Sequence, residues 1–169
     1  MGGLCAMAVF LLSYKVIELT LENLLSMLAA LFLVGVVLFP TGLPPYISEL
    51  TPLQRAWGEE RVETLHFVAA AIFISLLAVI SFFFGVREAR RAQSGRLSPR
   101  FWRRFHWSCV LAILAAIAWL LGVVTNLWGG SHAILIGEWV AIYAFGASWL
   151  TKGFEYHYLF RTGAPASRD

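Results

Sequence analysis

Residues 65–86 read LHFVAAAIFISLLAVISFFFGV, and this stretch decides the class of fold. It contains no Asp, Glu, Lys or Arg, and it exceeds the about 20 apolar residues that a helix needs to cross a bilayer core. The whole chain agrees, since 59% of its 169 residues are hydrophobic and 14% are charged. A soluble domain typically carries about 25% charged residues. Lipid is therefore the expected solvent for most of these side chains.

Helix start and stop signals divide the rest of the chain into four further apolar segments. The stretch 39–42 (FPTG) ends one of them. The stretch 51–54 (TPLQ) predicts a helix start, because it has a threonine cap, a first-turn proline and a glutamine at capping-box spacing. The helix that begins there either continues into residues 65–86 or breaks at Gly58. Ser98-Pro99 predicts a start of the same kind. We expect an all-α polytopic bundle of about five transmembrane helices, near 4–19, 21–39, 62–86, 105–127 and 132–152, in one domain of residues 1–163 with a flexible tail at 164–169.

The distribution of charge predicts how these spans are oriented. The link between the third and fourth spans is rich in arginine and contains one acid, Glu88, so we expect it in the cytoplasm. The link between the second and third spans is acidic, so we expect it outside. The N-terminus is then outside and the C-terminus cytoplasmic. The arginines of this link form a basic cluster, which consists of Arg87, Arg90, Arg91, Arg96, Arg100, Arg103 and Arg104. We expect the cluster to contact anionic lipid, and we do not expect it to bind nucleic acid.

Polar side chains inside the predicted spans are the candidates for a functional site. Glu138 lies about two turns into the last span, where an ionisable group costs roughly 2.5–3.5 kcal/mol to insert. His66 opens the third span on the same outer side, and Asn126 and His132 lie at similar depth. These four residues either line an outward-facing polar pocket that binds a proton or a ligand, or they serve as interhelical and interfacial hydrogen-bonding groups.

Sequence motifs of known enzymes are missing from the chain. We find no HExxH, phosphate loop or nucleophile elbow, so no catalytic residue, metal site or cofactor is assigned. Cys5 and Cys109 are predicted near opposite faces of the membrane, so a disulfide between them is not expected. Aromatic residues near the span ends are expected to anchor the helices at the lipid headgroups, with a ligand cage as the alternative: Trp57, Trp102, Trp107, Trp128, Trp149, Tyr156 and Tyr158.

Several short stretches carry a resemblance to a known group of proteins. They are 3–15 (GLCAMAVFLLSYK), 38–42 (LFPTG), 65–70 (LHFVAA), Gly137-Glu138 and 148–153 (SWLTKG). Together they resemble a family of uncharacterised bacterial integral membrane proteins of six-helix type, a domain of unknown function. The resemblance implies an additional helix upstream of the first segment and a polar outer loop, and we expect that this chain lacks both. It implies a fold and no activity.

Three classes of function remain open. The first is a structural or accessory subunit that docks through its helices within a membrane complex, with membrane lipids and other membrane subunits as partners. The second is a small transporter, or a ligand or proton sensor, that uses a pocket of Glu138 and His66. The third is a membrane enzyme that acts on a lipid or a quinone. All three imply a multi-pass protein of the bacterial cytoplasmic membrane.

Overall fold

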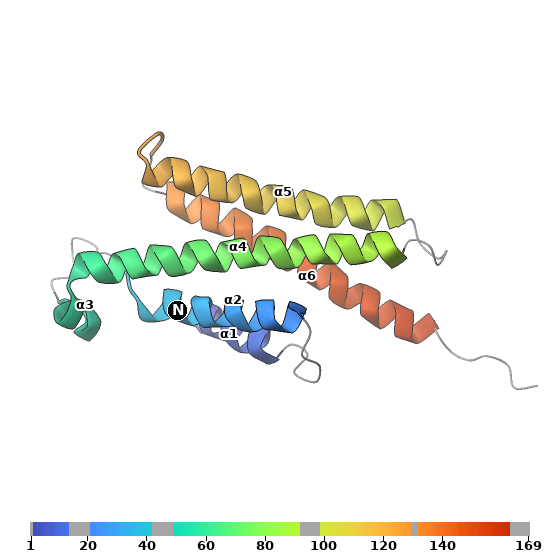
Figure 1. Cartoon of the computed structure of the whole chain (residues 1–169), viewed down its shortest axis with the longest axis horizontal. Coiled ribbons are helices and arrows are strands. Elements are labelled where there is room, and N and C mark those ends of the chain that lie inside the picture. Colours follow the sequence, from blue (N-terminus) through green and yellow to red (C-terminus); the bar gives the residue numbers. More distant parts are fainter. Residues whose placement is uncertain (1, 14–20, 42–48, 92–98, 130–131, 163–169) are drawn as a thin grey trace, which may run out of the picture. The chain divides into compact units, whose positions relative to one another are not determined.

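The computed structural model describes residues 2–13, 21–41, 49–91, 99–129 and 132–162. These ranges contain helices and no strand, which confirms the all-α class for the described part of the chain. Arg96 of the basic cluster and the predicted tail at 164–169 lie outside the described residues. The helices, coloured in chain order in Figure 1, are α1 (Gly2–Ser13), α2 (Leu21–Leu38), α3 (Pro52–Trp57), α4 (Glu59–Arg91), α5 (Pro99–Val124) and α6 (Ala133–Thr162).

Three helices in the described ranges are long and apolar enough to cross a membrane. The qualifying stretches are Glu59–Val86 in α4, Phe101–Val124 in α5 and Ala133–Lys152 in α6. The apolar helices Gly2–Ser13 and Asn23–Leu38 are shorter. At 1.5 Å per residue they fall below the about 30 Å of a bilayer core. The third, fourth and fifth predicted spans therefore have the required helix length in the described residues.

Contacts divide the chain into two compact units, Met1–Ile80 and Ser81–Asp169. In the first unit, α1 packs on α2, and the Ser26 hydroxyl donates a hydrogen bond of 2.9 Å to the Leu11 carbonyl. Helix α2 also approaches α4, because a Cβ placed on Gly35 would lie 3.3 Å from the Cβ of Ala69. Small residues thus allow close packing of these apolar helices.

The short helix α3 begins and ends as its sequence predicts. The Thr51 side chain accepts from the Gln54 backbone N–H, and the Gln54 side chain accepts from the Thr51 backbone N–H, which completes the capping box. The helix breaks at Gly58, whose φ of 88° is a conformation that favours glycine. This break settles which of the two predicted courses the chain takes: α3 and α4 are separate helices. Gln54, almost fully buried, also donates to the Thr41 carbonyl at 3.4 Å.

The second unit contains α5 and α6, which pack on each other and are joined by a tight turn. The indole of Trp128 stacks on that of Trp119 with 5.6 Å between the ring centroids, and it donates to the Trp119 carbonyl at 3.0 Å. The Trp119 indole in turn donates to the Ala133 carbonyl at 2.8 Å. A Cβ on Gly122 would collide with Trp128, so glycine at this position makes the turn possible. The predicted antiparallel pairing of these two helices is confirmed.

Candidate functional site

His66 holds the end of α2 against α4. Its Nδ1 lies 2.6 Å from the Phe39 carbonyl oxygen and 3.1 Å from that of Val36. Both partners accept, so Nδ1 carries the proton and donates to them. Carbonyls at a helix C-terminus lack partners within the helix and require donors from elsewhere. One nitrogen of the predicted pocket residue His66 therefore has a structural role.

Asn126 also has a structural role. It adopts a left-handed conformation with φ of 57°, just beyond the end of α5. The Leu127 N–H donates to the Gly122 carbonyl at 2.9 Å, and the Asn126 N–H donates to the Val123 carbonyl at 3.1 Å. This pair of bonds is a Schellman motif, in which a left-handed residue satisfies the last carbonyls of a helix. The exposed side chain of Asn126 is thus explained by backbone conformation, because asparagine tolerates this region.

Glu138 and His132 lie at the start of α6, His132 directly before its first residue. Glu138 is half-buried and His132 is exposed. Beside Glu138, a Cβ on Gly137 would lie 2.8 Å from the side chain of Leu120, so α5 and α6 approach closely at this depth. Glu138, Asn126 and His132 belong to the unit Ser81–Asp169, whereas His66 belongs to Met1–Ile80. The outward-facing pocket of all four residues stays a prediction.

The basic cluster spans the end of α4 and the start of α5. Arg103 and Arg104 are exposed on α5, where they are available to solvent or lipid headgroups. The backbone of Arg100 lies in the first turn of α5. The backbones of Arg87, Arg90 and Arg91 lie in the last turns of α4.

A polar group that the sequence did not single out lies in the second unit. The Nδ1 of His106 lies 2.9 Å from the Ser148 hydroxyl, and both residues are fully buried between α5 and α6. Lys152 follows Ser148 by four residues, on the same helix face, and is also buried. The four-residue spacing of Ser148 and Lys152 was visible in the sequence, but the contact of Ser148 with His106 depends on how α5 and α6 pack.

Trp149 packs beside this group. It is 8% exposed, with its ring centroid 5.6 Å from that of Phe84 and 5.2 Å from that of Phe145. This burial departs from the expectation of a tryptophan at the lipid headgroups, because Phe84 and Phe145 provide an apolar site for the ring. Trp57, Trp107 and Trp128 are each exposed over 40% or more of their surface, and their position at the lipid headgroups stays a prediction.

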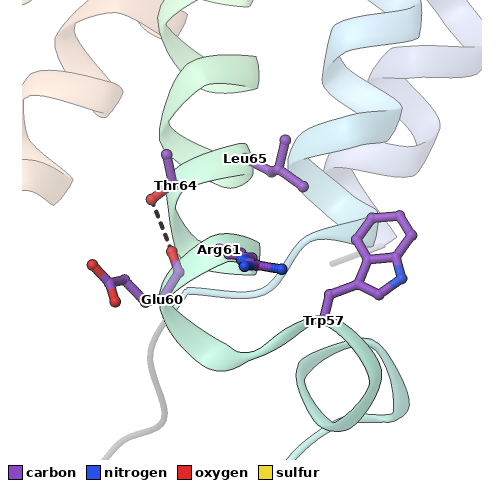
Figure 2. A pocket seen from close by; sticks show the side chains of 5 residues that line it. All are labelled: Trp57, Glu60, Arg61, Thr64 and Leu65. Atoms are coloured by element: carbon purple, nitrogen blue, oxygen red, sulfur yellow. Dashed lines mark hydrogen bonds between the residues drawn. The ribbon is translucent and has the colours of Figure 1, made fainter.

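A pocket of about 700 Å³ opens at the junction of α3 and α4. Figure 2 shows Trp57 at the end of α3 facing the start of α4, with the Arg61 side chain extending toward it. Glu60 extends to the other side of α4, and the Thr64 hydroxyl donates to the Glu60 carbonyl at 2.8 Å. Leu65 lies one turn further along α4 than Arg61, on the same face. The sequence signal for this pocket was the placement of Arg61 four residues before Leu65 and three residues after Gly58, the glycine that ends α3.

Metal ligation is not indicated in the described ranges, since no group of three or more His, Cys, Asp or Glu side chains comes together there. Cys5 is exposed, Cys109 is buried, and both are free thiols. Comparisons of the chain with known protein families, with curated proteins and with solved structures find no match. The functional proposal is therefore based on the described residues of this chain.

Proposed function

We propose that the chain is a multi-pass protein of the bacterial cytoplasmic membrane and that it serves as a structural or accessory subunit of a membrane complex. In this proposal, five spans in a single domain cross the bilayer, with the N-terminus outside and the C-terminus in the cytoplasm. The three long apolar helices support membrane insertion. Large apolar side chains that are exposed along α5 also support membrane insertion, among them Leu111, Leu114 and Leu121. Their exposure would be unfavourable in water but is not unfavourable in the hydrocarbon of a bilayer.

The observation that carries the accessory role is an exposed seam on α6, which we call the α6 seam. It consists of Ile136, Trp139, Tyr143, Gly146 and Leu150, at alternating spacings of three and four residues. The four larger side chains are 52%, 55%, 69% and 63% exposed in that order. At Gly146, no atom lies within 4 Å of the position that a Cβ would occupy, so a neighbouring helix has room to approach the backbone. This spacing is that of a helix packing knobs into holes.

Tyr143 favours a protein neighbour over lipid at this seam. It lies near the middle of Ala133–Lys152, where the surrounding hydrocarbon would offer its hydroxyl no acceptor. Burial of a hydroxyl without a hydrogen bond costs about 1–3 kcal/mol by mutational measurements. A partner helix that presents a carbonyl, hydroxyl or carboxamide acceptor would remove this cost. The proposed partner is therefore a transmembrane helix of another subunit.

Insertion and orientation are tested with single cysteines in intact cells. Cys5 and Cys109 are first replaced by alanine, and Ser48→Cys or Ser94→Cys is then introduced in the predicted outer or inner link. A membrane-impermeant maleimide is expected to label Ser48→Cys without lysis and Ser94→Cys only after lysis. Labelling of both before lysis, or extraction of the chain from membranes by alkaline carbonate, would contradict the membrane topology.

The accessory role is tested by photocrosslinking from the α6 seam. A benzophenone amino acid at Tyr143 is expected to yield one protein adduct of defined mass, whereas the same group at the exposed Leu111 of α5 should yield lipid adducts only. Gly146→Leu should abolish the protein adduct and leave insertion unchanged, because it fills the space for a neighbouring helix. An adduct of twice the chain mass would identify a second copy as the partner. Lipid adducts alone at both positions would exclude docking at this seam.

A further inference from the structure

One face of α5 changes from cationic to apolar along the helix. Arg103 and Arg104 are exposed near its start, and Trp107 follows them by about one turn and is 40% exposed. Leu111 and Leu114 come next and are 64% and 49% exposed. At 3.6 residues per turn, these five positions fall on one helix face about 100° wide. Guanidinium, indole and alkyl groups therefore follow one another as the phosphate, the glycerol esters and the acyl chains do in a phospholipid.

Trp107 is held in place at the middle of this face by two residues of α4. Its ring centroid lies 5.2 Å from that of Phe82, and the two ring planes are 79° apart. A Cβ on Gly85 would lie 3.3 Å from the Trp107 Nε1, so the indole lies against a part of α4 that has no side chain. An amphipathic ring favours the headgroup level of a bilayer. Trp107 thus fixes the depth of this face, with Arg103 about 6 Å nearer the aqueous phase at 1.5 Å per residue.

The packing of α4 on α5 brings like charges to the same level. The ring centroids of Phe84 and His106 lie 6.0 Å apart where the end of α4 runs beside the start of α5 (Figure 1). Arg87 follows Phe84 by three residues and Arg103 precedes His106 by three, so their backbones lie level in this antiparallel pair. Residues 87–104 contain seven guanidinium groups and one carboxylate, a net charge of +6. A bound anion would relieve the repulsion among these charges.

The two exposed arginines are available to such an anion. Neither Arg103 nor Arg104 forms an ion pair with a carboxylate within the part of the chain that the structure describes. Two adjacent guanidinium groups present several N–H donors that suit the oxygens of a phosphate. The charge of this end of α5 therefore favours a ligand with a phosphate and a net negative charge, and its leucines favour one with acyl chains.

We propose that this face of α5 binds a phospholipid of net negative charge. Arg103 and Arg104 hold its phosphate, and its acyl chains follow Leu111 and Leu114. The sequence predicts only that the basic cluster contacts anionic lipid, and the packing of Trp107 favours one face of one helix for that contact. The binding chemistry rests on residues of the unit Ser81–Asp169. The assignment of the lipid to the cytoplasmic leaflet rests on the proposed membrane orientation.

Native mass spectrometry of the detergent-purified full chain tests this assignment. The protein is titrated with phosphatidylglycerol or with phosphatidylethanolamine of the same acyl chains, and bound lipid is counted at each concentration. Phosphatidylglycerol is expected to bind several-fold more tightly, because its headgroup is anionic and that of phosphatidylethanolamine is zwitterionic. Arg103→Gln and Arg104→Gln should each weaken phosphatidylglycerol binding about fivefold. Equal binding of the two lipids by the unchanged chain would overturn the proposal.

Matched variants separate this face from general charge effects. Arg55→Gln and Arg61→Gln remove exposed arginines from the acidic segment at α3 and the start of α4, and so change the net charge by the same amount. Both should bind phosphatidylglycerol within about twofold of the unchanged chain. If they lose as much affinity as Arg103→Gln and Arg104→Gln, the lipid is not bound at α5. Circular dichroism of each variant shows whether the helices are retained.

Photolabelling in membranes keeps both arginines and therefore does not depend on the folding of those variants. A benzophenone amino acid at Leu111 is expected to yield lipid adducts in which phosphatidylglycerol exceeds its share of the membrane several-fold. The control is Leu121, which is 61% exposed on the same helix and lies about 15 Å further along it at 1.5 Å per residue. Its adducts should follow the composition of the membrane. Adducts of that bulk composition at both positions would overturn the proposal.

Glycerophosphoglycerol, the same headgroup without acyl chains, distinguishes the lipid from a soluble phosphate ester. Because Leu111 and Leu114 extend the site into apolar surface, this compound is expected to compete only at far higher concentration than the lipid. Competition at equal concentration would overturn the assignment to phospholipid. A failed orientation test with Ser48→Cys and Ser94→Cys would remove the leaflet assignment alone, because the titrations measure lipid binding by the purified chain.

Discussion

Two helix junctions in this protein are built on different principles. The junction of α2, α3 and α4 is held by polar side chains that bond to backbone carbonyls, with His66 on Phe39 and Gln54 on Thr41. The junction of α5 and α6 is held by indole rings that pack where glycine leaves space. The first junction is open enough to contain a pocket, whereas the second is closed over Gly122. The hydrogen-bonded junction leaves an opening beside α3, whereas the indole rings fill the space at the turn between α5 and α6.

The largest effect is expected at the packed junction. Gly122→Ala places a methyl group into the Trp128 ring, so the ring must leave its stack on Trp119 and its bond to the Trp119 carbonyl. We expect a loss of about 2–3 kcal/mol in the free energy of unfolding. Gly146→Ala is the control, since that position is open, and it should be neutral or slightly stabilising. Thermal unfolding in detergent gives the melting temperatures of the two variants. Equal melting temperatures would show that the turn between α5 and α6 is not tightly packed.

The polar junction is expected to respond to the loss of its histidine. His66→Phe keeps an aromatic ring but removes the N–H that donates to the Phe39 and Val36 carbonyls. The predicted loss is about 1.5 kcal/mol, because two half-buried carbonyls are left without this donor. The matched variant Leu127→Phe introduces the same ring at a side chain that is 73% exposed and should stay within about 0.5 kcal/mol. Similar unfolding free energies for the two variants would contradict the structural role of His66.

A smaller change in the free energy of unfolding is expected at Asn126 in the α5–α6 turn, and its sign depends on the residue that replaces asparagine. Asn126→Val introduces a β-branched residue at a φ of 57° and should destabilise the protein by about 1 kcal/mol. Asn126→Gly suits the same conformation and should be neutral or stabilising. Chemical denaturation of the two variants measures their free energies of unfolding and tests this difference. If both destabilise equally, Asn126 acts through its side chain, as the predicted polar pocket requires.

The smallest effect is expected at the cap of α3. Thr51→Ala removes the hydroxyl that accepts from the Gln54 N–H, at a cost of about 0.5–1 kcal/mol. Thr125→Ala is the comparison, since that exposed hydroxyl bonds only to carbonyls of the preceding turn. The ring of Trp57 should become more accessible to a fluorescence quencher in Thr51→Ala than in Thr125→Ala. An unchanged accessibility would show that the capping box does not hold Trp57 in position.

Local signals in the sequence predicted much of the backbone. The capping box at Thr51, the alternative of a break at Gly58 and the tight link after α5 all depend on residues within a few positions of one another. The three long apolar helices were predictable for the same reason, because length and composition alone decide them.

Side-chain roles were predicted less well, because they depend on which helices meet. His66 and Asn126 were identified either as pocket residues or as hydrogen-bonding groups, and only the packing of the helices showed that His66 bonds to the Phe39 carbonyl and that Asn126 adopts a left-handed turn. Trp149 was assigned to the headgroup region, and its contacts with Phe84 and Phe145 bury it instead. A sequence shows that a residue is polar or aromatic within an apolar segment. It does not show whether that side chain contacts a carbonyl, an aromatic ring or lipid in the folded protein.

The Schellman motif at Asn126 has a consequence for biosynthesis. Its bonds, and those of Trp119 and Trp128, join residues that lie within about fifteen positions of one another. Contacts of such low sequence separation form quickly. The hairpin of α5 and α6 is therefore expected to assemble as soon as its second helix emerges from the ribosome, and to enter the bilayer as a preformed pair. A nascent chain arrested once Lys152 has left the ribosome would then already show the Trp119–Trp128 stack.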